Sequence, residues 1–123
     1  MAKTALELIP AEWRAYQPAQ CQATQRATAR WQRAWDIARL AANLLREQFG
    51  AQRVVVFGSL TCAAWFTPWS DIDVAAWGIP ACDFYRAVAV ITGLSPEFQL
   101  DLLDPDTCRP TLRQRIEREG IAV

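Results

Sequence analysis

The longest regular pattern of apolar positions runs from Gln22 to Phe49, where apolar residues recur every three to four positions. This spacing is typical of an amphipathic α-helix, and Gly50 suits the left-handed position that ends many helices. The apolar arc is wider than one packing face needs. It divides into two stripes, of which Trp31, Trp35, Ala38, Ala42, Leu45 and Phe49 form the first, and Ile37, Leu40, Ala41 and Leu44 the second. The second stripe is a candidate surface for a partner.

The segment before this helix has a different pattern. Residues 1–20 contain Pro10 and Pro18, and prolines at this spacing favour an irregular N-terminal arm. We expect Trp13 and Tyr16 of this arm to pack against apolar surface. The arm is therefore the alternative cover for the second stripe of the helix.

Three short segments in the second half of the chain have the patterns of strands. Residues 53–57 form a β-branched apolar run that predicts a buried strand, ended by Gly58 and Ser59. Residues 70–76 alternate polar and apolar side chains, which predicts a strand with one face in water. Residues 98–103 return to a strand pattern. Helical spacing predicts helices at residues 60–66, 80–92 and 110–119.

The predicted order is helix, strand, helix, strand, helix, strand, helix. This order is typical of an α/β or α+β fold in which helices cover one small mixed sheet. A length of 123 residues and a hydrophobic content of 52% fit a single domain over residues 1–123 with one core.

Composition excludes several kinds of chemistry. Thirteen basic and thirteen acidic side chains cancel, so no field of one sign attracts nucleic acid or an anionic membrane, and we expect neither as a direct partner. Histidine is absent, which excludes histidine-based triads and zinc sites. The four cysteines form no C-x-x-C pair. The opening MAKTALELIP is neither a signal peptide nor long enough to span a bilayer, so we expect a cytoplasmic protein.

The second predicted strand carries Asp71 and Asp73, two residues apart. Both carboxylates should leave the same face of the strand, about 6.5 Å apart. Two carboxylates on one face suit Mg²⁺, which prefers carboxylate oxygens together with substrate phosphates. An isolated D-x-D motif is weak evidence, so its surroundings decide its meaning.

Two further features of the sequence are placed where they could join Asp71 and Asp73 in one site. Gly58 and Ser59 stand between a predicted strand and a predicted helix, where backbone N–H groups and a hydroxyl can hold phosphate oxygens. The structural alternative is a tight turn in which Ser59 caps the helix. Asp101 interrupts an apolar strand, and beside the second strand it can reach the same face; otherwise it is a surface residue of an edge strand. Together these features fit two-metal phosphoryl chemistry.

The stretch VVVFGSLTCAAWFTPWSDIDVAAW resembles the signature of the polymerase-β-like nucleotidyltransferase superfamily, in which Gly-Ser precedes D-x-D by about ten residues. The chain is more closely similar to the minimal nucleotidyltransferase (MNT) branch, where a helix precedes the first strand and a phrase like LDLLDPDTCRPTLRQRIEREG ends the domain. The resemblance covers residues 22–121 and implies the polymerase-β-like nucleotidyltransferase fold.

The resemblance also implies roles. Gly58 and Ser59 would bind the β- and γ-phosphates of ATP. Asp71 and Asp73 would ligate two Mg²⁺ ions, and Asp101 would complete the catalytic metal site and help the acceptor lose its proton. One departure concerns the phosphates, because many relatives follow Gly-Ser with Arg-Ala-Arg-Gly, whereas this chain has Leu-Thr-Cys-Ala. Another arginine could substitute, or the metals could carry the charge alone.

Other side chains have packing as their first interpretation. Trp65 and Trp69 flank the loop inside the motif, so either is a candidate to line a nucleotide pocket. Asp104 and Asp106 come too late along the third strand to join the site, and we expect them in a loop.

Small MNT proteins resemble antitoxins that transfer AMP to a tyrosine of a HEPN ribonuclease toxin. The resemblance therefore implies a protein adenylyltransferase in a hetero-oligomer with a HEPN toxin, and the short chain favours a protein as the acceptor. One alternative is an antitoxin that neutralises its partner by binding alone. Another is transfer to a small hydroxylated molecule such as an aminoglycoside.

Overall fold

The computed structural model describes the backbone of residues 11–123 and the side chains from residue 25 on. Its elements are α2 (Ala11–Phe49), β1 (Arg53–Phe57), the 3₁₀ turn η1 (Gly58–Thr61), β2 (Ile72–Trp77), α3 (Ala81–Thr92), β3 (Leu100–Leu103), α4 (Pro110–Glu119) and β4 (Ile121–Ala122). The four strands form one mixed sheet in the order β3-β2-β1-β4. Strand β2 is antiparallel to β1 and parallel to β3, and β4 is antiparallel to β1. The α+β class and the mixed sheet predicted from the sequence are confirmed.

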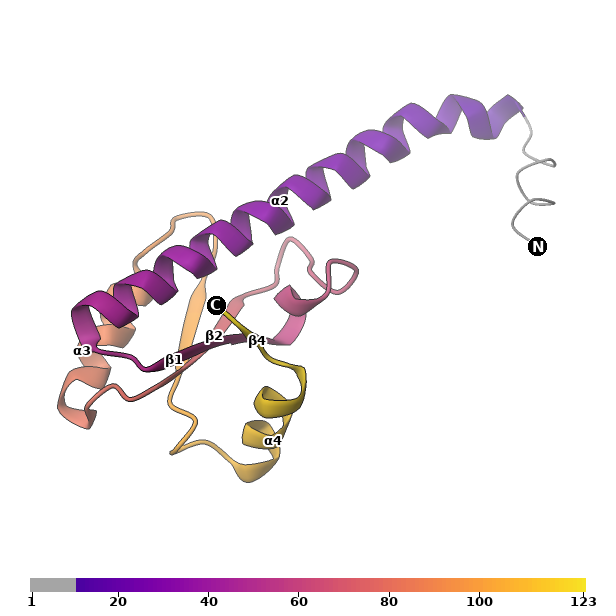
Figure 1. The fold of residues 1–123 in the computed structure, drawn as a ribbon. Coiled ribbons are helices and arrows are strands. Elements are labelled where there is room, and N and C mark those ends of the chain that lie inside the picture. Colours follow the sequence, from indigo (N-terminus) through magenta and orange to yellow (C-terminus); the bar gives the residue numbers. More distant parts are fainter. Residues whose placement is uncertain (1–10) are drawn as a thin grey trace.

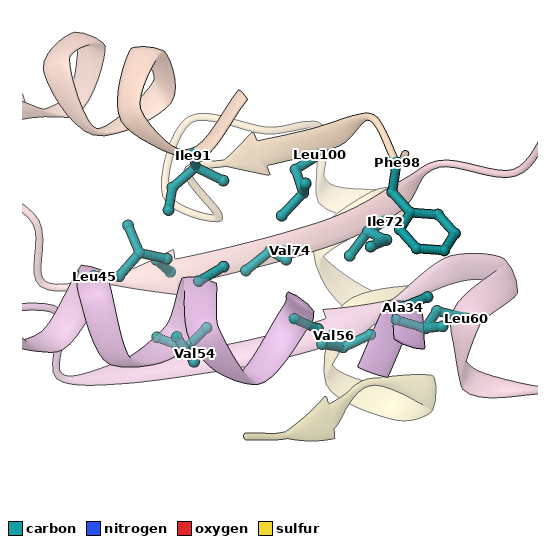
Figure 2. Packing of buried hydrophobic residues seen from close by; sticks show 14 of the residues in the cluster. Ala34, Leu45, Val54, Val56, Leu60, Ile72, Val74, Ile91, Phe98 and Leu100 are labelled. Carbon is teal, nitrogen blue, oxygen red and sulfur yellow. The ribbon is translucent and has the colours of Figure 1, made fainter. Parts of the chain in front are cut away.

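Helices cover both faces of the sheet. Figure 1 shows α2 along one side and α4 on the other, with the first part of α2 extending beyond the sheet. Alternation along the strands divides the side chains accordingly. Val54, Val56 and Val74 pack under α2 and α3 in the larger core cluster, part of which Figure 2 shows. Val55 and Ala75 pack against Ile116 of α4 in a second, smaller cluster.

The first helix is longer than its pattern predicts. It begins at Ala11 rather than Gln22, so the irregular arm is wrong for residues 11–20. Good helix formers surround Pro18, and a helix can continue past a proline when it gives up one backbone hydrogen bond. The expected packing of Trp13 and Tyr16 lies outside the described side chains. Residues 1–10 also lie outside the described part.

The two apolar stripes of α2 have different outcomes. The first is buried from Trp35 to Phe49, with Trp31 half-buried at its end. In the second, Ala41 is buried and Ile37 and Leu44 pack at the edge of the core. Leu40 is 45% exposed. Most of the second stripe is therefore covered by the domain itself.

The helix predicted at residues 60–66 is absent from this part of the structure. The chain forms the 3₁₀ turn η1 there and continues in turns as far as Ser70. Side-chain and i+3 bonds replace a helical ladder: Thr61 Oγ1 donates to the carbonyl of Gly58 at 2.7 Å, and the Cys62 amide donates to Ser59 at 3.3 Å. Hydroxyl side chains compete with helix formation in this way.

The remaining elements differ from their predictions mainly at their ends. The helices at residues 81–92 and 110–119 are confirmed. Strand β2 begins after Asp71, and its two faces are not one dry and one wet, because Ala75 and Ala76 are both buried. Strand β3 starts at Leu100, since Ser95 Oγ accepts the amide of Phe98 in a preceding turn. Strand β4 is too short to leave a pattern in the sequence.

Candidate active site

Strand pairing brings the predicted carboxylates to one end of the sheet. In the parallel pair of β2 and β3, Asp73 lies directly opposite Asp101. In the antiparallel pair of β1 and β2, Asp73 lies opposite Phe57. Paired positions share a face, so Asp73 and Asp101 lie on the face that α4 covers. Asp71 precedes β2, and Gly58 and Ser59 follow β1 at the same end.

Gly58 is matched to Asp73. Its backbone has φ +76°, a left-handed conformation that side chains disfavour. A Cβ atom at this position would lie 2.5 Å from Asp73 Oδ2, well inside contact distance. The turn after β1 therefore passes directly beside the Asp73 carboxylate, and only glycine permits this approach.

The Gly58–Thr61 turn is anchored from the opposite face of the sheet. Trp31 of α2 donates its indole N–H to the carbonyl of Leu60 at 2.8 Å, and Leu60 itself is fully buried. Because this turn has four residues and leads into β2 without an α-helix between them, the helix dipole that the sequence suggested for phosphate binding is missing. The turn amides and the half-buried Ser59 remain as the groups that can meet a phosphate.

Negative charge accumulates around Asp73. Burial, together with the charges of Asp101 and Asp71, raises its pKa from 3.8 to about 6, while the charge of Arg115 acts in the opposite direction. Within the described side chains, none of the three carboxylates takes part in a side-chain hydrogen bond or ion pair. A carboxylate that is partly buried beside two others favours either a proton or a cation.

The three carboxylates share one end of the sheet without forming a closed ligand set. Among the described residues, no three His, Cys, Asp or Glu side chains are placed closely enough to hold a metal ion together. Mutual repulsion favours rotamers that separate the oxygens. Asp73 is half-buried, whereas Asp101 is exposed on the edge strand β3. The donor chemistry of these oxygens still fits a hard divalent cation.

Arg115 is the neighbour that sequence reasoning missed. It lies on α4, which carries three arginines, Arg113, Arg115 and Arg118, and no local pattern distinguishes it from the other two. Its charge acts on Asp73 although the two residues are far apart in sequence. Only the orientation of α4 on the sheet shows which arginine faces the carboxylates.

The structure also places the aspartates and tryptophans that the sequence analysis set outside the catalytic set. Asp104 and Asp106 lie in the loop after β3, where Asp104 Oδ1 accepts the Asp106 amide at 3.0 Å and Asp106 pairs with Arg113 at 3.4 Å. Both are loop residues, as expected. Trp69, two residues before Asp71, is 87% exposed, and Trp65 is 62% exposed. Neither is a core residue.

A pocket of about 700 Å³ lies elsewhere, between α2 and β4. Trp31, Trp35, Arg39, Thr61 and the residues of β4 line it. None of the predicted site residues does. The candidate active site is thus an open surface at the strand ends rather than this pocket. No helix in the described part is long and apolar enough to cross a membrane.

The fold defines the class of protein. No protein-family profile and no curated protein sequence matches the chain. Among solved structures, it is similar to a protein provisionally described as a minimal nucleotidyltransferase, with a TM-score of 0.52 and 26% identity over 79% of this chain and 95% of that one. It is also similar to a crystal structure of a toxin-antitoxin with AMP-PNP, with a TM-score of 0.54 and 21% identity over 66% of this chain and 67% of that one. The chain therefore has the fold of minimal nucleotidyltransferases.

Proposed function

We propose that the protein is an antitoxin that transfers AMP from ATP to a tyrosine hydroxyl of a HEPN ribonuclease toxin. The observation that carries this proposal is the pairing of Asp73 with Asp101, next to Asp71 and the Gly58–Ser59 turn. The similarity to a minimal nucleotidyltransferase supports the chemistry. The similarity to a toxin-antitoxin with AMP-PNP supports the nucleotide and the kind of partner.

Asp71, Asp73 and Asp101 would hold two Mg²⁺ ions. When bound, Mg²⁺ neutralises the phosphate charge and acidifies an acceptor hydroxyl. Burial and the neighbouring carboxylates raise the pKa of Asp73, which supports this assignment, because a partly buried carboxylate beside like charges favours a bound cation. Gly58 and Ser59 would receive the β- and γ-phosphates at the turn beside Asp73.

The transfer is a single displacement. The acceptor oxygen forms a bond to the α-phosphorus of ATP, the bond between that phosphorus and the α,β-bridging oxygen breaks, and pyrophosphate leaves. Asp101 accepts the proton of the hydroxyl. Its exposure on an edge strand supports this role, because a protein acceptor can approach it from outside the sheet. A tyrosine needs such help, since its pKa is about 10.

The test is incubation of the chain with ATP, Mg²⁺ and a HEPN partner, followed by mass spectrometry for added AMP. Asp101→Asn should slow AMP transfer at least about 100-fold yet keep most of the affinity for ATP. Asp71→Asn should lower both the transfer rate and the affinity for ATP. Asp36→Asn is the matched control, because Asp36 is exposed on α2 across the sheet. Calorimetry should show ATP binding with Mg²⁺ and much weaker binding with EDTA.

Neutralisation by contact alone is the second candidate function. The observation that favours it is the absence of arginine in Leu60-Thr61-Cys62-Ala63, directly after Gly58-Ser59. If the wild-type chain leaves its partner unmodified, and Asp101→Asn still blocks the toxin, then contact is the function and the catalytic proposal is wrong.

A further inference from the structure

The phase of α4 on the sheet is fixed by its buried side chains. Ile116 is fully buried against Val55 and Ala75, and Leu112, one turn earlier, packs beside it. At about 100° per residue, Arg115 and Glu117 then project to opposite flanks of the helix. Arg118 points away from the sheet, about 200° from Ile116.

One flank of α4 is identified by its contacts. Glu117 pairs with Arg53, the first residue of β1, at 3.0 Å. Arg113 donates to the carbonyl of Pro105, beyond the end of β3, at 2.8 Å. Because β1 is antiparallel to β2 and β2 is parallel to β3, the start of β1 and the end of β3 lie at the same end of the sheet. This is the end away from the candidate site.

Arg115 therefore faces the opposite end, where β1 finishes and β2 and β3 begin. That end holds the Gly58–Ser59 turn, Asp73 and Asp101. The effect of Arg115 on the pKa of Asp73 agrees with this placement. In Figure 1, α4 lies on the side of the sheet opposite α2.

The guanidinium of Arg115 is oriented and partly available. Its Nε donates to Glu119 Oε2 at 3.2 Å, one turn along the helix, and the side chain is 59% exposed. Within the described residues its two terminal nitrogens have no hydrogen-bond partner. A guanidinium with free terminal N–H groups binds phosphate oxygens with good geometry.

We propose that Arg115 binds the triphosphate of the nucleotide and supplies the positive charge that the segment after Gly58-Ser59 lacks. This inference rests on the proposed nucleotidyltransferase function. Three carboxylates would otherwise repel a triphosphate wherever the metals do not fully compensate. Arg115 of α4 would thus take the role of the arginine that many members of the resembled family have directly after Gly-Ser.

The test is calorimetry of AMP-PNP binding in MgCl₂ for the wild type, Arg115→Gln and Arg118→Gln. Arg115→Gln should weaken AMP-PNP binding about 10-fold or more. Arg118→Gln changes the same residue type on the same helix, on the side away from the sheet, and should stay within about twofold. Arg115→Lys should recover part of the affinity, because it restores the charge without the planar fork. AMP, which has no β- or γ-phosphate, should bind Arg115→Gln and the wild type alike.

The outcomes separate this inference from the function on which it rests. If the wild type binds AMP-PNP and Arg115→Gln binds it equally well, the role of Arg115 is wrong and the nucleotidyltransferase proposal stands. If the wild type shows no binding, both fail. Thermal unfolding of each variant establishes that it is folded, and Arg115→Lys carries the comparison if the glutamine variant is not. An equal loss in Arg118→Gln would also overturn the specific role of Arg115.

Discussion

Asp73 is held beside Asp101 by strand pairing and beside Gly58 by a turn that has no room for a Cβ atom. These contacts partly bury a carboxylate among like charges, so its ionisation opposes folding. Residues that bind ligands or metals often destabilise the folded protein in this way, because a side chain whose charge serves to bind a ligand or cation has no oppositely charged partner within the protein.

Asp73→Asn should stabilise the protein at neutral pH. The folded pKa of about 6 lies above the ordinary value of 3.8, so the folded state holds the proton more tightly. The contribution of Asp73 to stability therefore falls as pH rises from about 4 to 6, and its full penalty is present above pH 6. A difference of about two pKa units corresponds to ~3 kcal/mol, and solvent screening of this half-exposed group reduces the expected gain to ~1 kcal/mol.

Urea denaturation at pH 8 and pH 4 measures this effect. Asp73→Asn should exceed the wild type at pH 8, and the gap should close near pH 4. Asp36→Asn, at an exposed position, should show no such change. A gap of the same size at both pH values would mean that ionisation of Asp73 is not its cause.

The position of α4 on the sheet depends on the close approach of Gly120 to Val55. Gly120 ends the helix with an ordinary φ of −68°, so backbone conformation does not require glycine there. A Cβ atom would, however, overlap Val55 Cγ1 and the carbonyl oxygen of Ile116. Glycine is needed because the end of α4 lies directly on the middle of β1.

Gly120→Ala should lower stability by about 2 kcal/mol, since the new methyl group must push α4 away from a buried strand. Gly93→Ala is the control. Gly93 also ends a helix with negative φ, but a Cβ there would meet only Ala89 O at 3.6 Å. Thermal unfolding should show a clear loss for the first variant and a change within about 0.5 kcal/mol for the second. Equal effects would show that helix-end conformation matters rather than contact with Val55.

At the scale of the whole molecule, the edges of the sheet bear on whether the protein aggregates. β3 forms one edge, and the short β4 covers β1 on the other. The backbone of Val55 and Val56 pairs with β4, and the Val123 amide donates to Val54 at 3.0 Å. A run of three valines with an open edge would be a template for intermolecular strand pairing.

Removal of residues 121–123 should therefore cause aggregation at concentrations where the intact chain stays dispersed. Light scattering during slow heating is the measurement. Ile121→Thr is the control, because it reduces the apolar surface of a 42% exposed side chain and keeps the backbone hydrogen bonds. If the shortened chain remains monomeric, the edge of β1 is protected by some other feature.

The sequence by itself determined the main elements and the candidate residues. Periodicity located the buried strand at residues 53–57 and the helices at 81–92 and 110–119, because a packed face imposes its repeat on the side chains. It also marked Asp71, Asp73 and Asp101 as carboxylates on or beside strands. Their catalytic roles remain predictions.

Tertiary structure alone decided how these pieces meet. The register that places Asp101 opposite Asp73 is a long-range pairing, which local sequence does not encode. The turn at Gly58–Thr61 replaced a predicted helix because Trp31 and Thr61 bond its carbonyls. Arg115 is directed toward Asp73 because the packing of Ile116 against the sheet fixes the rotation of α4. Helical periodicity predicts the buried face of α4 but does not indicate which end of the strands lies beside each flank.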